Sequence, residues 1–270
     1  MFQYTYLHEF QLKYMILKEN DYMIIDCNNI PNIQFGDTPY YFNGKPVPRV
    51  THILSSMLHE EYLMDWAEKM GRIKQNRNVI LQNAADIGNE VHGMCENFLR
   101  YRMVPIFKNI PGSYSRNSKQ CKIRNAFEGF MMWINNLDNN CIWKPLMMEV
   151  PLINELYGGT LDALIEIDGK IYIVDFKTSN QMSYKYILQV IAYRKTLKDI
   201  YGINTDGCIV LRLEKYKKCF PEELVLDLTK PDVLEFAGYC ENMFMSLVYS
   251  YYNRMIVENY YKYCTGGKRL

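Results

Sequence analysis

Residues 158–178 read GGTLDALIEIDGKIYIVDFKT and contain the strongest structural signal in the chain. Apolar runs flank Asp168-Gly169, a dipeptide that favours a two-residue hairpin turn. A turn there folds the runs into antiparallel strands and places Asp162 directly opposite Asp175. Opposed strand positions have Cβ atoms about 4.5–5.5 Å apart, where like charges destabilise a sheet. The pair therefore predicts either a shared proton or a bound cation.

Lys177 lies two residues after Asp175, so we expect both side chains on one face of the strand. Two acids and a lysine on one sheet face are the parts of a metal-dependent site that cleaves phosphodiesters. Lys177 would orient the attacking water or neutralise charge on the phosphate, and the carbonyl of Phe176 is within reach of a metal. The alternative is a pair of solvated strand acids beside an ordinary exposed lysine. The opposition of the two acids favours the site.

Composition restricts the class of protein. The 270 residues are 49% hydrophobic, enough for one substantial core. The net charge is +1, so any phosphate-binding surface has to be a local patch. The eight cysteines form no CxxC pair, which argues against a zinc site or a redox dithiol. The chain shows no export signal and no membrane-spanning apolar run, so we expect a soluble intracellular protein of the bacterial or host cytoplasm, or of a DNA-containing compartment.

The pattern of apolar residues predicts an α/β fold, a sandwich with a mixed central sheet flanked by helices. Residues 72–83 continue as helix or loop, and 105–118 read as a loop. We expect one domain over 1–270, with an N-terminal extension (1–45), a core (46–228) and a C-terminal helix (229–270). The expected elements are a hairpin at 40–45 turning at Asn43-Gly44, helices over 51–70 (capped by Thr51 or Ser55), 84–102, 119–136, 182–201 (closed by Gly202) and 233–261, and strands over 147–153, 160–167, 170–177, 208–213 and 223–228.

Other candidate site residues lie on helices and on the first strand. Gln189 and Tyr193 share a helix face with Lys185 one turn earlier, so they could order the lysine or contact a nucleic-acid backbone. The alternative is a tyrosine packed in the core beside a solvated glutamine. His92 lies within a helix; its imidazole could bind Mn²⁺ or Mg²⁺, although a lone helical histidine is more often structural. Glu149, on the first strand, either approaches the site or faces solvent, and we give these alternatives equal weight.

Two basic clusters could hold phosphates, or could be solvated surfaces, which is the commoner outcome for charge runs. The first contains Arg72, Lys74 and Arg77, and the second contains Arg116, Lys119, Lys122 and Arg124.

Three motifs together resemble the PD-(D/E)XK nuclease superfamily: Gly159-Thr160-Leu161-Asp162, Asp175-Phe176-Lys177-Thr178 and Gln189-x-x-x-Tyr193. More narrowly, the chain looks like the RecB/AddB-type exonuclease branch, which includes phage exonucleases and the mitochondrial genome maintenance exonuclease. Residues 48–54 (PRVTHIL), followed by Trp66-Ala67, are similar to the leading segment of phage-type members. The resemblance covers roughly residues 46–213.

The resemblance implies a restriction-endonuclease-like αβββαβ core and DNA hydrolysis with Mg²⁺ or Mn²⁺, without a covalent intermediate. Some members of this branch hold an iron–sulfur cluster on closely spaced C-terminal cysteines. Here Cys240 and Cys264 are far apart, so we predict no cluster. The implied metal ligands are His92, Asp162, Asp175 and the Phe176 carbonyl; the implied catalytic residues are Asp162, Asp175, Lys177, Gln189 and Tyr193; Thr178 and Lys185 are expected at the nucleic acid.

The expected function is a metal-dependent DNA exonuclease of recombination, repair or replication, including a viral setting. DNA, single- or double-stranded, is the expected partner, and a membrane is not. No helicase motor is present, so processivity would need a helicase, annealing or single-strand-binding partner, or an oligomeric ring. Two alternatives stay open: a structure-specific endonuclease on the same core, and a nucleic-acid-binding protein with a vestigial site. A fourth interpretation is that the hairpin acids are coincidental.

Overall fold

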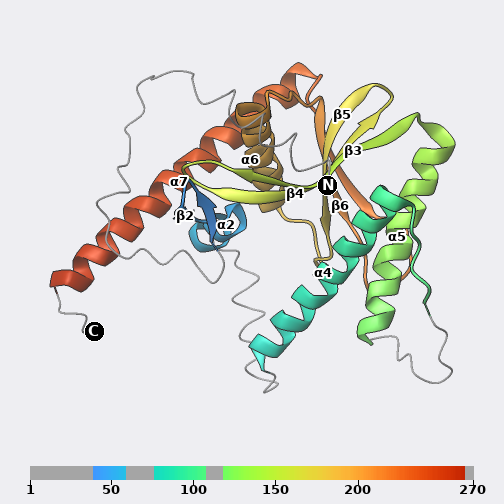
Figure 1. Cartoon of the computed structure of the whole chain (residues 1–270), viewed down its shortest axis with the longest axis horizontal. Coiled ribbons are helices and arrows are strands. Elements are labelled where there is room, and N and C mark those ends of the chain that lie inside the picture. Colours follow the sequence, from blue (N-terminus) through green and yellow to red (C-terminus); the bar gives the residue numbers. More distant parts are fainter. Residues whose placement is uncertain (1–38, 59–75, 108–117, 265–270) are drawn as a thin grey trace.

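The computed structural model describes residues 39–58, 76–107 and 118–264 (Figure 1). In chain order its elements are β1 (Tyr40–Phe42), β2 (Lys45–Val47), α2 (Val50–Met57), α4 (Arg77–Tyr101), α5 (Lys119–Asn140), β3 (Trp143–Ile153), β4 (Gly158–Ile167), β5 (Lys170–Lys177), α6 (Tyr184–Tyr201), β6 (Gly207–Arg212), β7 (Glu222–Asp227) and α7 (Pro231–Cys264).

The central sheet has five strands in the order β3-β4-β5-β6-β7. The β5–β6 pair is parallel and the other three pairs are antiparallel. A parallel pair needs a long crossover connection, and α6 provides it. The strands before β5 and after β6 can return through short connections. The expected mixed α/β architecture, with a central mixed sheet flanked by helices, is confirmed.

Helices cover both faces of this sheet and divide the apolar core in two (Figure 1). The α6–α7 core also includes residues of α2, and the α4–α5 core lies on the opposite face. Along β5, Ile173 belongs to the α6–α7 core, whereas Val174 and Phe176 belong to the α4–α5 core. Because strand side chains alternate, Asp175 and Lys177 lie on the α6 face.

Both predicted two-residue turns, Asn43-Gly44 and Asp168-Gly169, are confirmed. Asp168 and Gly169 have φ values of 49° and 77°, the left-handed pair that a type I′ turn requires. The β4–β5 ladder runs from the Ile167–Lys170 pair to the Ala163–Val174 pair, which is the register predicted from the turn.

The start of α2 differs from the prediction. Neither Thr51 nor Ser55 caps it, because the helix begins at Val50 and its N-cap position, Arg49, makes no side-chain capping bond. Ser55 instead donates to the carbonyl of His52. Leu58 is extended and ends the helix, so the prediction of one helix through residue 58 is wrong. Residues 59–70 lie outside the described part of the chain.

Helices α4, α5 and α7 are longer than predicted, whereas α6 starts two residues later than expected. Asn76 caps α4 by accepting a hydrogen bond from the amide of Asn78 (3.0 Å), so the helix starts seven residues before the predicted Ala84. Ser118 and Ser183 cap α5 and α6 in the same way, and Gly202 closes α6 with a φ of 67°. Within the described ranges, no helix has both the length and the apolarity needed to cross a bilayer.

Phe130 supports the α4–α5 core beneath the sheet, and we expect Phe130→Ala to lower the free energy of unfolding by about 3–5 kcal/mol. Its ring is fully buried and lies 5.5 Å from Phe176 and 5.8 Å from Phe98, centroid to centroid. Urea unfolding measures the loss. The matched control is Ile106→Ala, at a side chain 91% exposed, which should stay within about 0.5 kcal/mol of wild type. Equal losses would contradict this account of the core.

Candidate metal centre and cleft

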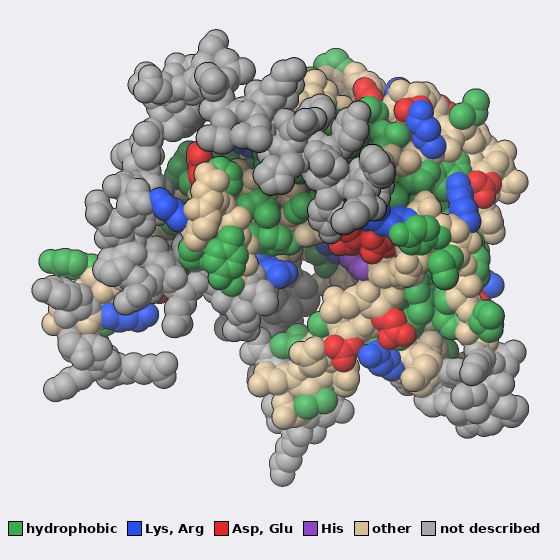
Figure 2. All heavy atoms as spheres, viewed as in Figure 1, with side chains coloured by type: hydrophobic (Ala, Val, Ile, Leu, Met, Phe, Trp, Pro, Cys, Tyr) green, Lys and Arg blue, Asp and Glu red, His purple; other side chains and the backbone are tan. Residues whose placement is uncertain are grey.

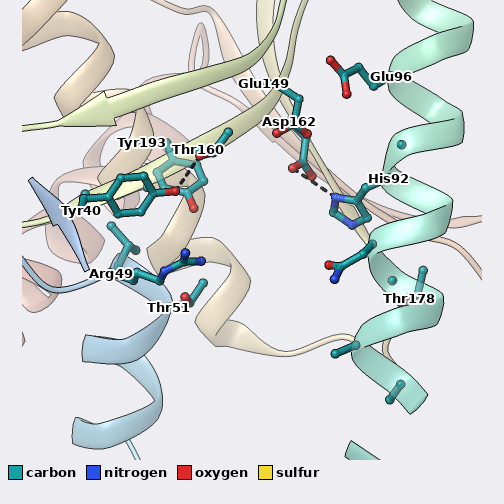
Figure 3. Close-up of a pocket in the computed structure, with 18 residues that line it drawn as sticks. Tyr40, Arg49, Thr51, His92, Glu96, Glu149, Thr160, Asp162, Thr178 and Tyr193 are labelled. Atoms are coloured by element: carbon teal, nitrogen blue, oxygen red, sulfur yellow. Dashed lines mark hydrogen bonds and ion pairs between the residues drawn. The ribbon is translucent and has the colours of Figure 1, made fainter. Parts of the chain in front are cut away.

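A cleft of about 650 Å³ lies between α4 and the start of β4. His92 lines it from α4, Glu149 and Asp162 from the sheet, and Tyr40 and Arg49 from the opposite wall (Figure 3). Figure 2 shows acidic and histidine side chains together in a hollow of this face of the molecule. Segments distant in sequence thus converge on one polar cavity.

Beside this cleft, the alternation of side chains between the two sheet faces is interrupted in both β3 and β4. Two neighbouring pairs show the interruption: Val150–Leu161 in the α6–α7 core and Met148–Ala163 in the α4–α5 core. Residues two apart in a regular strand share a face, so both strands rotate at the intervening residues, Glu149 and Asp162. Glu149 has a φ of 49°, which is uncommon for a residue with a Cβ. The rotation brings the two carboxylates toward His92.

His92, Glu149 and Asp162 each offer a ligand atom, and these atoms lie within 4.8 Å of one another. Nδ1 of His92 is 3.3 Å from Oδ1 of Asp162. The second oxygen of Asp162 accepts a hydrogen bond from the amide of Phe176 (2.7 Å). The carboxylate of Asp162 therefore links β4 to β5 beyond the end of their ladder while it faces α4.

Asp175 lies in a second, deeper group of polar side chains. Its carboxylate is 1% exposed, and Oδ2 lies 2.7 Å from Nζ of Lys177. Gln189 on α6 donates to Oδ1 of Asp175 (3.2 Å) and to the hydroxyl of Tyr193 (3.0 Å). The structure thus brings together all four residues that the sequence motifs single out here.

One geometric expectation needs correction: the two acids do not share a sheet face. The ladder ends at Ala163–Val174, and beyond it Asp162 turns toward α4 while Asp175 points toward α6. The reason is the rotation of β4 at Asp162, which the hairpin turn alone does not reveal. Asp162 remains close enough to raise the pKa of Asp175.

The electrostatic surroundings separate the two aspartates. Burial raises the pKa of Asp175 to about 6, although Lys177 acts in the opposite direction. Burial also acts to raise the pKa of Asp162, but His92, Lys177 and the Phe176 amide together outweigh it and the pKa is lowered. Burial acts to lower the pKa of Lys177, but the charges of Asp175 and Asp162 act against it and the pKa is raised. Asp162 is therefore the more readily ionised carboxylate.

These residues fit a hard divalent cation. Carboxylate oxygens suit Mg²⁺ and Mn²⁺, and an imidazole nitrogen suits Mn²⁺ better than Mg²⁺. Oδ2 of Asp175 is buried and receives no well-aligned hydrogen bond despite its ion pair with Lys177, so it keeps capacity for a further partner. Phe176 supports the site with its ring, 6.0 Å from that of His92. A role for its carbonyl stays a prediction.

Two glycines let tyrosines approach the start of β4. A Cβ on Gly158 would lie 2.6 Å from Tyr40, and one on Gly159 would lie 2.4 Å from Cε1 of Tyr193. The hydroxyl of Tyr40 is hydrogen-bonded to that of Thr160 (2.6 Å). The two glycines of the motif thus have a packing reason to lack side chains.

Sequence reasoning missed the wall opposite His92. Tyr40 and Arg49 lie more than 100 residues before Thr160, and the guanidinium of Arg49 is 5.2 Å from the Tyr40 ring centroid. Arg49 stood within the segment noted for its similarity to phage-type nucleases, which was the available signal. Glu149, left open by the sequence, lies in the ligand cluster.

Among the predicted phosphate-binding residues whose side chains the structure describes, four lie outside the lining of the cleft and one lies in it. Thr178 lines it, and Lys185 donates to the carbonyl of Leu58 (2.8 Å). On and around α5, Lys119 lies 3.8 Å from both Asp86 and Glu90, Arg124 pairs with Glu128 (2.8 Å), and Lys122 lies over the Tyr216 ring. Arg72, Lys74 and Arg116 lie outside the described residues, as does the side chain of Arg77.

We expect Gly159→Ala to lower the free energy of unfolding by about 1–3 kcal/mol, because the added methyl would collide with Tyr193. It should also disturb the Gln189 bridge to Asp175. Thermal unfolding measures the loss. The control, Gly238→Ala on α7, adds a methyl that meets nothing within 4 Å and should be neutral or stabilising. A neutral Gly159→Ala would contradict the close approach of Tyr193.

No protein-family model matches this chain, and no curated protein sequence matches it. Its function therefore has to be inferred from the chemistry of the cleft.

Proposed function

We propose that this protein is a metal-dependent deoxyribonuclease that hydrolyses phosphodiester bonds, acting as an exonuclease in recombination, repair or replication. One observation carries the proposal. A three-residue cluster of possible metal ligands, His92, Glu149 and Asp162, lies in the cleft beside the buried Asp175–Lys177 ion pair. Ligands for a divalent cation next to a positioned ammonium can support the hydrolysis of a phosphodiester.

The order of the elements supports a restriction-endonuclease-like core. The succession α5, β3, β4, β5, α6, β6 has the αβββαβ order that the resemblance implies. The ligand cluster and the ion pair lie on the three successive strands β3, β4 and β5 and on α4. The same combination of order and site placement is the reason we favour this core over other mixed sheets.

The side chains have distinct roles in the proposed reaction. His92, Glu149 and Asp162 would hold the cation, with Asp175 and the Phe176 carbonyl as further ligands. A bound Mg²⁺ or Mn²⁺ would supply positive charge against the scissile phosphate and lower the pKa of an attacking water. Lys177 would donate a hydrogen bond to that water or to a phosphate oxygen. Gln189 holds the carboxylate of Asp175, and Tyr193 holds Gln189.

Arg49 gives the cleft a positive charge on the wall facing α4 (Figure 3). A nucleic-acid backbone that entered between the two walls would meet the guanidinium on one side and the proposed cation on the other. Phosphate contacts of this kind position a substrate without reading its sequence. The cleft is therefore suited to a polymer with repeated phosphates.

Metal binding should strengthen as the pH rises through about 6. Asp175, with its pKa raised to about 6, and His92, whose pKa Asp162 raises against the effect of burial, must both lose their protons to become ligands. Protons therefore compete with the metal at low pH. The increase in melting temperature caused by Mn²⁺ should grow between pH 5 and pH 8 and be abolished by Asp162→Asn. A shift that is independent of pH, or intact in the variant, would contradict the site.

Digestion of end-labelled linear and covalently closed circular DNA, single- and double-stranded, with Mg²⁺ or Mn²⁺ tests the activity itself. We expect loss of linear DNA with circles spared. Lys177→Ala should lower kcat by about 10²–10⁴-fold, because it removes the ammonium at the reacting phosphate. The control is Lys170→Ala, an exposed lysine at the other end of β5.

Each other outcome of the digestion has a meaning. Cleavage of circles would reassign the protein as an endonuclease on the same core. Binding of DNA without cleavage of any substrate would favour a vestigial site. Equal activity of the two lysine variants would reject the role proposed for Lys177.

A further inference from the structure

The segment 178–183 connects the proposed catalytic strand to α6 without regular secondary structure. Thr178, its first residue, lines the cleft, and its Oγ1 would lie 3.3 Å from a Cβ placed on Gly88. The segment also fixes the spacing between Lys177 and the α6 residues that hold Asp175. Its conformation therefore bears on the geometry of the site.

Donors at and just after the end of β6 satisfy four successive carbonyls, that of Lys177 and the first three of this segment. The amide of Leu213 donates to the carbonyl of Lys177 (2.7 Å). The ammonium of Lys215 donates to the carbonyl of Thr178 (2.6 Å). One guanidinium nitrogen of Arg212 reaches the carbonyls of Ser179 (3.4 Å) and Asn180 (3.3 Å). Two cationic side chains thus replace the partner strand that this backbone lacks.

Lys215 is an unusual residue to find in this place. Its side chain is 8% exposed, and among the described residues no carboxylate forms an ion pair with it. Burial and the neighbouring charge of Lys122 lower its pKa. Asn125 on α5 fixes its backbone by donating to the Lys215 carbonyl (3.0 Å). Burial of a lysine is unfavourable, and the charge of Glu214 offsets only part of the effect of burial on the pKa of Lys215.

We propose that Lys215, assisted by Arg212, is a positioning residue of the reaction. Its ammonium holds the Thr178 carbonyl, and this contact keeps Thr178 in the cleft wall and Lys177 directed at Asp175. The inference rests on the proposed nuclease function for its kinetic consequence. We call the contacts of Lys215 and Arg212 with the carbonyls of residues 178–180 the backbone clamp. The clamp can be measured without any assay of activity.

The test compares Lys215→Met with wild type in two measurements on the full chain. Methionine keeps the length and the apolar stem but removes the donor and the charge. Hydrogen exchange of the amides in 177–182 should become at least about tenfold faster, because local opening costs less. On linear DNA, kcat should fall at least about tenfold with KM within about threefold, the signature of a group that acts after binding.

Two further variants sharpen the comparison. Lys215→Arg retains a cationic donor and should restore part of kcat, which a merely space-filling role would not require. Arg212→Met removes the contacts to Ser179 and Asn180 and should give a smaller effect of the same sign, even if Lys215→Met fails to fold. Its matched control is Glu222→Gln, which removes only the Arg212–Glu222 ion pair (2.7 Å).

The outcomes separate this inference from the proposed function. Unchanged exchange in Lys215→Met, or in Arg212→Met if the first variant does not fold, would overturn the clamp. Faster exchange with unchanged kcat would overturn its role in the reaction. Absence of cleavage by wild type with every DNA and metal would reject the nuclease proposal and the kinetic role together, while the exchange measurement would still decide whether the clamp exists.

Discussion

The site depends on the two oxygens of Asp162. One faces His92 on α4, and the other accepts the amide of Phe176 on β5. A carboxylate that bonds to two elements at once fixes their separation, and the rotation of β3 and β4 at Glu149 and Asp162 makes this possible. Without that rotation, the side chain of Asp162 would point to the α6 face and α4 would have no acid to meet.

The buried Asp175–Lys177 ion pair is expected to add little to the free energy of unfolding. Withdrawing two charges from water costs several kcal/mol per ion, and the attraction between them returns that cost only with good geometry. Gln189 and Tyr193 occupy buried positions on α6 to hold one side of this pair, which adds further desolvated polar groups. Such an arrangement is characteristic of functional sites, where perturbed pKa values cluster.

Local patterns in the sequence predicted much of the fold, but they did not predict the contacts between segments that are distant in the sequence. Asp168-Gly169 fixes a register because a type I′ turn leaves one pairing, and Gln189 and Tyr193 share a helix face because of the helical period. The left-handed backbone of Glu149 carries no such signal, since glutamate seldom adopts it. Tyr40 and Arg49 reach the cleft only through tertiary packing against Gly158, which no local pattern encodes.

Charge balance explains how the ligand cluster in the cleft and the buried Asp175–Lys177 pair beside it depend on each other. With His92 neutral, three carboxylates (Glu149, Asp162 and Asp175) face one ammonium (Lys177), which leaves a net charge of −2 in a largely desolvated volume. Protons relieve part of this charge, as the raised pKa values of Asp175, Glu149 and His92 indicate. A divalent cation would relieve all of it and make the protons unnecessary. The excess negative charge that makes the cluster unfavourable without a cation would therefore supply its affinity for a doubly charged ion.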